Sequence, residues 1–403
     1  MPAVVKVLIL LIFCLHALGQ GSQYARAADL VVTDVRISAA AGQTRIVMNL
    51  SDSANITPFT LADPNRLVLN MPETVWKLPA SRQKEKGGLI KGFRFGKLGA
   101  GRSRAIFDLS GPARLTEHIT LPPQGERRYR LVLDLVPVPE AEFRRLSGWP
   151  DAERSAGGQS DLAPPRTPPK RTKKLICLDP GHGGIDPGAT GVSGALEKDI
   201  VLAAALEFQE TLRRTGRYQI ALTRDSDVFL SLKARVAYCR SRSADLMISI
   251  HADSAGGAGA QAKGATIYTL SEKASDQEAE ALAQSENQSD IIAGVDIGRE
   301  DDVVSSILID LAQRDTKANS VKFAKVLAPE MAKTGRSMPR SHKFAGFRVL
   351  KAPDVPSVLL EMGYLTNADD ELQLKSETWR RQLAQAVLRA LDAYFAAAPA
   401  KAP

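Results

Sequence analysis

Cysteine is scarce in this sequence, with three residues in a chain of 403. Three cysteines are too few for the disulfide framework of a small secreted domain. Cys14 lies in a segment that we expect to be removed, so Cys177 and Cys239 are the cysteines of the mature chain. Cys177 lies in an apolar strand pattern and Cys239 in a helical one. We therefore expect two buried thiols, with a disulfide between them as the alternative.

Long hydrophobic runs are also missing after the N-terminus, where no stretch is apolar enough to cross a membrane. At the N-terminus itself, Lys6 precedes an apolar run over residues 7–18, and a small-x-small cleavage site follows at residues 25–27. The run is about a dozen residues long, short of the ~20 that a spanning helix needs. We expect residues 1–27 to be a cleaved Sec-type signal peptide, and an uncleaved membrane anchor is the alternative.

Charge is only modestly unbalanced. The 53 basic and 45 acidic residues give a net charge of +8, and loss of Lys6 and Arg26 with the signal would leave 51 against 45, or +6. An apolar share of 44% and a charged share of 24% are typical of a globular chain, here long enough for two or three domains. A basic exported protein suits a cell wall, a membrane face or nucleic acid, and charge alone does not choose among them.

The region from residue 28 to 138 has the short alternating runs of an all-β unit. Strands are predicted at residues 31–37, 44–50, 66–71, 104–109 and 130–136. A weak repeat relates residues 45–51 (RIVMNLS) to 104–110 (RAIFDLS), and residues 66–71 (RLVLNM) to 130–135 (RLVLDL). We expect two similar halves that face each other as a small sandwich.

A basic segment separates the two halves of this unit. Residues 77–104 hold nine basic residues against one acid, Glu85, with Trp76, Phe93 and Phe95 interspersed. This pattern fits a docking face for an anionic polymer, and basic side chains on a solvated loop fit it as well. Residues 139–173, rich in Pro, Gly, Ser and charge, are predicted to be a semi-rigid linker.

From residue 174 to 398 the pattern alternates between strands and helices, which is typical of an α/β domain with a mostly parallel sheet flanked by helices. Strands are predicted at residues 175–178, 219–223, 246–250, 265–270, 347–350 and 357–360. Helices are predicted at residues 198–215, 231–242 and 369–397.

Two of the four histidines outside the signal peptide lie just past predicted strand ends, where open α/β sheets bind ligands. His182 lies among three glycines, and His251 follows the strand at 246–250. Glu197 begins a helix fifteen residues after His182, so its carboxylate can return to the same edge. This His/Glu/His set would leave a zinc ion one position for water. A structural role for any one of them is the alternative.

Glu361 follows the apolar strand at 357–360 and is placed for general base work at the same edge. Zinc lowers the pKa of bound water toward ~7, which would give Glu361 a proton to accept. Asp253, two residues after His251, fits a carboxylate that orients a metal ligand, and a solvated loop carboxylate fits equally.

Four separated motifs match a known pattern in order and spacing: LDPGHGG at 178–184, EK at 197–198, SIHAD at 249–253 and LEMGYLTN at 360–367. They resemble the catalytic domain of the zinc N-acetylmuramoyl-L-alanine amidases of the Amidase_3 type. The resemblance implies that His182, Glu197 and His251 bind Zn²⁺, that Glu361 is catalytic, and that the substrate bond is the amide joining N-acetylmuramic acid to L-alanine in peptidoglycan.

The β unit at residues 28–138 resembles the AMIN domain that often precedes this catalytic domain in Gram-negative cell-division amidases. That resemblance implies a periplasmic enzyme, targeted to peptidoglycan at the division site, that acts in septal splitting and daughter-cell separation.

Residues 271–315 hold twelve acids against three bases and include a helical pattern. They resemble an insertion found in a branch of the family, where a helix covers the active site and places a glutamate on the zinc until an activator of the LytM-domain type removes it. The resemblance implies autoinhibition, with Glu272, Glu280 or Glu286 as the occluding ligand. An ordinary acidic surface helix is the alternative.

Three other functions remain to be weighed. A non-catalytic wall-binding protein with a structural zinc site is disfavoured, because such a site normally has four protein ligands. A zinc peptidase that acts within the stem peptide would use similar chemistry and differs in its products. A nucleic-acid binder is disfavoured because neither helix-turn-helix nor zinc-finger spacing occurs.

Overall fold

The computed structural model describes residues 29–78, 85–99, 101–125, 128–150, 171–254, 263–294, 307–334 and 337–397. The expected signal peptide at 1–27, residues 79–84 of the basic segment, residues 151–170 of the linker and residues 295–306 of the acidic insertion lie outside this part. Among the helices described, none is long and apolar enough to cross a membrane.

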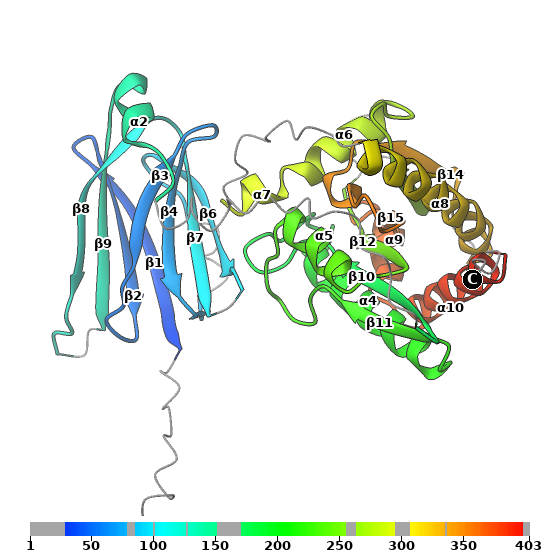
Figure 1. Cartoon of the computed structure of the whole chain (residues 1–403). Coiled ribbons are helices and arrows are strands. Elements are labelled where there is room, and N and C mark those ends of the chain that lie inside the picture. The colour runs from blue at the N-terminus through cyan, green and yellow to red at the C-terminus, as the bar shows by residue number, and fades with distance from the viewer. Residues whose placement is uncertain are drawn as a thin grey trace, which may run out of the picture.

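The N-terminal part is a sandwich of two mainly antiparallel sheets, with strand orders β5-β1-β2-β9-β8 and β3-β4-β7-β6 (Figure 1). Its strands are β1 (Leu30–Ala40), β2 (Gln43–Leu50), β3 (Thr57–Leu61), β4 (Arg66–Pro72), β5 (Thr74–Trp76), β6 (Ile90–Lys97), β7 (Arg102–Leu109), β8 (Ala113–Leu121) and β9 (Tyr129–Pro137). Alternate residues of β2, namely Ile46, Met48 and Leu50, are fully buried between the sheets. The two-residue period of a strand therefore builds the core, as the sequence pattern predicts.

The strands of the sequence repeat are distributed between the two sheets differently from the expectation. The repeated segments are β2 with β7 and β4 with β9, and β2 pairs with β9 in one sheet while β4 pairs with β7 in the other. Each half of the repeat thus contributes one of these strands to each sheet. The expectation that one half faces the other is wrong, because strands exchange between the halves to form each sheet.

The linker begins later than residue 139. Helix α2 (Glu140–Leu146) packs its fully buried Phe143 into the sandwich core. Farther on, Gly148 donates its N–H to the carbonyl of Thr60, and Trp149 contacts the ring of Phe59 with centroids 5.5 Å apart. The described residues up to 150 therefore belong to the sandwich, because the aromatic side chains of Phe143 and Trp149 pack on it despite the polar residues around them.

The C-terminal part is an α/β domain with the strand order β11-β10-β12-β15-β13-β14. All neighbouring strands are parallel except the antiparallel pair of β13 and β15. The strands are β10 (Lys174–Pro180), β11 (Tyr218–Leu222), β12 (Leu246–His251), β13 (Ala265–Leu270), β14 (Ser337–Ala345) and β15 (Ser357–Glu361). The predicted fold class is therefore confirmed.

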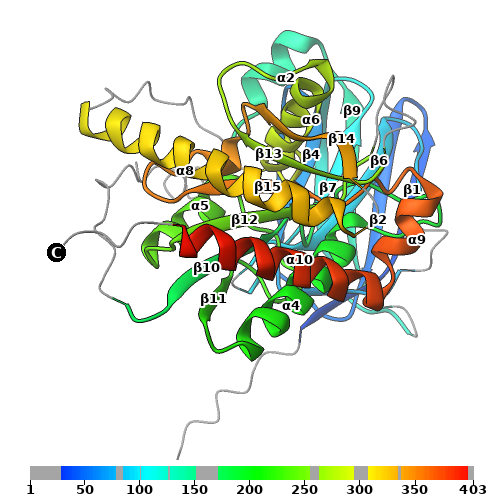
Figure 2. The ribbon, with the colours of Figure 1, turned by 90° about the vertical axis from the view of Figure 1, so that its right-hand side faces the viewer.

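Helices cover both faces of this sheet. Helices α4 (Glu197–Arg214), α8 (Ile307–Ala332) and α10 (Glu377–Ala396) lie side by side on one face (Figure 2). The other face carries α5 (Leu232–Ser241) and α6 (Gln277–Asn287), which leads into the short α7 (Ser289–Ile292). Because β10, β12 and β15 are parallel neighbours, their carboxyl ends meet at one edge.

Two predicted elements are wrong in detail. The apolar residues 347–350 are not a strand: the strand is β14, and Arg348–Leu350 form a 3-10 turn, η3, with Val349 and Leu350 buried. A short, buried apolar run is too short to show whether its hydrophobic period is that of a strand or of a helix. The closing helix is divided into α9 (Ala368–Leu374) and α10, which begins after Ser376 because the Ser376 hydroxyl accepts the N–H of Trp379.

Cys177 of β10 and Cys239 of α5 form a disulfide, with Cα atoms 5.8 Å apart. The expectation of two buried thiols is wrong, and its alternative is correct. The two residues are 62 apart in sequence, so only the packing of α5 on the sheet brings them within bonding range.

Candidate metal centre

The loop after β10 carries His182 in the left-handed backbone region, with φ of +56°. A Cβ atom on the preceding Gly181 would lie 2.3 Å from Cε1 of His251, so only glycine lets this loop approach the second histidine. The carbonyl of His182 accepts a hydrogen bond of 2.6 Å from Nη2 of Arg235, a buried residue of α5. Arg235 also donates to Oδ1 of Asp179 at 2.9 Å, so the start of the loop is held by a buried ion pair.

Glu197 is the first residue of α4 and is fully buried. Its Oε2 accepts the N–H of Ala189 at 2.8 Å, and its Oε1 accepts the N–H of Ala252 at 2.9 Å. These two backbone bonds fix the carboxylate beside His251, the last residue of β12.

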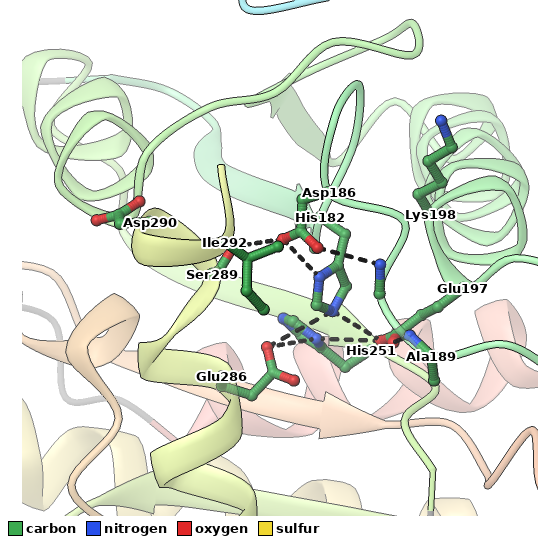
Figure 3. Close-up of polar contacts among 12 residues, drawn as sticks. His182, Asp186, Ala189, Glu197, Lys198, His251, Glu286, Ser289, Asp290 and Ile292 are labelled. Carbon is green, nitrogen blue, oxygen red and sulfur yellow. Dashed lines mark hydrogen bonds and ion pairs between the residues drawn. The ribbon is translucent and has the colours of Figure 1, made fainter. Parts of the chain in front are cut away.

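The three side chains meet at one point (Figure 3). Oε1 of Glu197 lies 3.2 Å from Nε2 of His182 and 3.3 Å from Nδ1 of His251. Both ring nitrogens are buried, and neither has a hydrogen-bond partner in the described part of the chain. A buried polar atom without a partner is costly, and a bound cation would remove that cost. His182, Glu197 and His251 can therefore hold a metal ion, with potential ligand atoms all within 4.8 Å of one another.

The charges around the histidines favour a cation. Burial lowers the pKa of His182, but the carboxylates of Glu197, Asp186 and Glu286 more than reverse this and place the pKa well above its ordinary value. Two imidazoles surrounded by three carboxylates form a site that attracts positive charge.

Asp186 fixes the ring of His182 and was missed in the sequence. Its Oδ2 lies 2.9 Å from Nδ1 of His182, and its Oδ1 accepts the N–H of Gly188 at 3.1 Å. Burial raises the pKa of Asp186, whereas the charge of His182 and the hydrogen bonds from His182 and Ser289 lower it, to about 2. The carboxylate is therefore ionised and accepts a hydrogen bond from Nδ1–H, which leaves the Nε2 lone pair for a metal. An acid four residues after a candidate ligand histidine was the available signal.

Asp253 contacts Glu361 through its backbone N–H. Its N–H donates to Oε2 of Glu361 at 3.1 Å, while its own carboxylate accepts the N–H of Ser254 at 2.6 Å. Burial and the charges of Glu197 and Glu286 raise the pKa of Asp253 to about 7. Among the described residues no hydrogen bond joins this carboxylate to either histidine, so its role in orienting a ligand stays a prediction. The side chain is buried, which does not fit the alternative of a solvated loop carboxylate.

Glu361 is the last residue of β15 and is the register partner of His251 on β12. It is fully buried, and its Oε1 has no hydrogen-bond partner in the described part of the chain. Burial, then the charges of Glu197, Asp253 and Glu286, raise the pKa of Glu361 well above its ordinary value. The sequence and the structure thus place this carboxyl group at the same sheet edge as the two histidines.

Of the three candidate glutamates, Glu272, Glu280 and Glu286, only Glu286 lies in the site. Its Oε2 is 3.2 Å from Nδ1 of His251 and 3.6 Å from Nε2 of His182. Glu272 and Glu280 are exposed, and Glu280 accepts a hydrogen bond from Gln284 of its own helix. Glu286 lies on the buried face of α6, and the helical period places Glu280 on another face, whereas Glu272 precedes the helix.

A family model described as N-acetylmuramoyl-L-alanine amidase matches residues 176–393, more than half of the chain. The chain belongs to that family. It is therefore an amidase that acts on peptidoglycan, and the resemblance found in the sequence is confirmed. An AMIN domain model also matches, over residues 34–135 of the β-sandwich.

Two named relatives align with most of this chain. An N-acetylmuramoyl-L-alanine amidase AmiC of Escherichia coli O6:H1 is 32% identical over 387 residues, covering 93% of this chain and 92% of the relative. An AmiC of Neisseria meningitidis is 33% identical over 377 residues, covering 90% and 89%. The solved catalytic domain of CwlV from Bacillus (Paenibacillus) polymyxa is 26% identical, with 56% of this chain and 99% of that chain covered and a TM-score of 0.42.

Proposed function

We propose that this amidase hydrolyses the bond between N-acetylmuramic acid and L-alanine with a Zn²⁺ ion held by His182, Glu197 and His251. The observation that carries the proposal is the pair of buried, unpartnered ring nitrogens that face one carboxylate oxygen. Two nitrogen donors and one oxygen donor suit zinc, and three protein ligands are the number found in catalytic sites. A zinc ion bound there supplies a Lewis acid for the amide carbonyl and lowers the pKa of water.

Glu361 is the proposed general base and acid. Its Oε2 is held by the N–H of Asp253, and its Oε1 has no partner in the described part of the chain, so one oxygen is available to the reacting atoms. A carboxyl group whose pKa is raised by burial takes up a proton readily near neutral pH. Glu361 would accept a proton from water and give it to the leaving nitrogen of L-alanine.

The test is digestion of purified sacculi, with zinc content measured in parallel. The variant Glu361→Gln should bind zinc and lose at least ~100-fold in kcat, and His182→Ala should lose zinc. Glu377→Gln, an exposed change on α10, serves as the matched control. Released peptides that begin with L-alanine support an amidase. Peptides cut within the stem would show a peptidase, and a zinc-loaded Glu361→Gln with full activity would remove this residue from the mechanism.

We also propose that Glu286 blocks the metal centre until an activator of the LytM-domain type displaces the α6–α7 segment. The support is the contact of Glu286 Oε2 with both histidines, at 3.2 and 3.6 Å. Glu286→Ala should then raise the basal rate and make added activator ineffective. A folded, zinc-loaded Glu286→Ala with wild-type basal rate would contradict the blocking role.

The proposed setting is the periplasm, where the enzyme would split the septum and separate daughter cells. A disulfide between Cys177 and Cys239 suits an oxidising compartment. The proposed units are a signal peptide at 1–27, an AMIN domain from residue 28, and a catalytic domain at 174–398 that contains the regulatory insertion 271–315. Fractionation of cells that express the full chain tests the location, since activity confined to the cytoplasm would refute it.

A further inference from the structure

Three arginines of the β-sandwich end on the α6–α7 segment of the other domain. They are Arg66 of β4, Arg94 of β6 and Arg104 of β7, and Figure 1 shows α7 lying against the side of the sandwich formed by β6 and β7. Two of them, Arg94 and Arg104, belong to the basic segment that the sequence left open between a docking face and a solvated loop. At these two positions the structure shows a third role, contact within the chain.

The arginines bind the backbone carbonyls at the end of α7. Arg66 Nη1 donates to the carbonyl of Ile291, Arg94 Nε to that of Ile292 at 3.0 Å, and Arg104 Nη1 to those of Ala293, at 3.3 Å, and Gly294. A helix leaves its last carbonyls without partners in the helix, and arginine side chains can satisfy them. Four consecutive carbonyls of the segment are held in this way.

The junction is buried as well as polar. Arg104 is fully buried, and its guanidinium lies 5.9 Å from the ring of Phe59 and 5.7 Å from that of Trp149. The next layer is apolar: Ala293 shares a cluster with Leu61, Val68 and Ile106 of the sandwich and with Ile185 and Phe229 of the α/β domain. Hydrogen bonds of a charged donor in such a place are costly to lose, because a buried carbonyl is then left without a partner.

The same segment carries Glu286, six residues before Ile292. Between them, the Ser289 hydroxyl donates to Asp186 Oδ2, and Asp290 Oδ1 accepts the N–H of Leu232 at 2.9 Å. The segment is thus fixed at one end in the metal centre and at the other end on the sandwich. A displacement that withdraws Glu286 must either bend the chain after Ser289 or break the arginine contacts.

We propose that the AMIN sandwich is the anchor that keeps the α6–α7 segment closed, with Arg66, Arg94 and Arg104 as the anchoring residues. The inference rests on the proposed blocking role of Glu286. It assigns the sandwich a regulatory task within the chain, so that any movement of the sandwich away from the catalytic domain loosens the glutamate in the metal centre.

The experiment compares basal rates of the zinc-loaded, full mature chain on a soluble muropeptide, so that binding to the wall plays no part. Arg94→Ala is the first variant, because Arg94 is only partly buried and lies outside the core of the sandwich. The variant removes one hydrogen bond to the segment, which should raise the basal rate by about tenfold; it also removes the 2.6 Å bond from Arg94 to Asp108, which lies within the sandwich. Arg45→Ala is the matched control: it removes an arginine whose bonds to Asp134, at 2.7 and 2.6 Å, lie in the other sheet, and it should leave the rate unchanged.

A second variant changes the residue on the α/β side of the junction, Gly294. Gly294 has φ of +60°, and a Cβ there would lie 3.1 Å from Cδ1 of Ile106 on the sandwich. Gly294→Ala should therefore raise the basal rate as well. This variant still tests the proposal if Arg94→Ala does not fold. In both variants the amides of residues 286–294 should exchange with deuterium faster than in the wild type.

The two proposals fail in different ways. If Glu286→Ala raises the basal rate while Arg94→Ala and Gly294→Ala leave both rate and exchange unchanged, the anchor is refuted and the blocking role stands. If Glu286→Ala has no effect but exchange at 286–294 rises in the two junction variants, the anchor holds the segment and the blocking role is wrong.

Discussion

Asp179→Asn should destabilise the α/β domain by about 3 to 5 kcal/mol, because it leaves the charge of Arg235 buried without a counterion. Both residues are at most 1% exposed, and Oδ1 of Asp179 lies 2.9 Å from Nη1 of Arg235. The hydroxyls of Thr223 and Ser249 donate to the same carboxylate at 2.6 and 2.8 Å. The substitution keeps the shape of the side chain, removes its charge and turns one acceptor oxygen into an NH2 donor, so the loss measures polar contacts rather than a cavity.

The assay is urea unfolding of the oxidised protein at pH 7, followed by circular dichroism. With an m-value of ~2 kcal/mol per molar urea, the midpoint should fall by roughly 2 M while m itself stays constant. Arg235→Met should be destabilising too, and the double variant should lose clearly less than the sum of the two single losses, because the uncompensated charge is then gone. A loss below ~1 kcal/mol for Asp179→Asn, or simple additivity in the double variant, would refute this reasoning.

The same pair has a pH signature. Burial raises the pKa of Asp179, but Arg235 and the two hydroxyls outweigh it and hold the pKa below its ordinary value of 3.8. The folded state therefore binds this proton more weakly than the unfolded state does, so the stabilisation is complete above the unfolded pKa of ~3.9 and is lost as the pH falls through the folded pKa. Wild type and Asp179→Asn should differ most above pH ~4 and converge in acid.

Two further predictions concern the surroundings of the metal centre. Asp186→Ala should weaken zinc binding by about 10- to 100-fold, because Nδ1 of His182 loses its acceptor, and competition with a chromophoric chelator measures this; an unchanged affinity would show that Asp186 does not position the ring. Joint replacement of Cys177 and Cys239 by Ala should lower the free energy of unfolding by about 2–4 kcal/mol in urea, and a reductant should lower the wild-type value similarly. A wild-type midpoint insensitive to reductant would contradict the second prediction.

The fold class and the principal site residues could be predicted from the sequence, because they depend on local patterns. A two-residue period marks the strands of the sandwich, and the alternation of strands and helices marks a mostly parallel sheet. Parallel strands share one carboxyl edge, so residues just after their ends, such as His182, His251 and Glu361, are expected to be neighbours before any distance is known.

The other features of the site depended on contacts between residues far apart in the sequence. A single sequence does not show which distant residues come close in space. Asp186 and Asp253 are equally plausible partners for a histidine, and only the path of the loop after β10 shows that Asp186 reaches His182. The helical period limits which glutamate of α6 can face the sheet, but the packing of that helix decides that it is Glu286.

The disulfide and the arginine contacts show most clearly what the tertiary structure decided and the sequence did not. Cys177 and Cys239 become neighbours only when α5 packs on the sheet. Arg94 and Arg104 belong to a segment that, by composition, resembles a solvated basic surface, and the docking of two domains turns them toward the end of α7. Sequence periodicity fixes which face of an element is buried, whereas the partner on the other side of that face is chosen by tertiary packing.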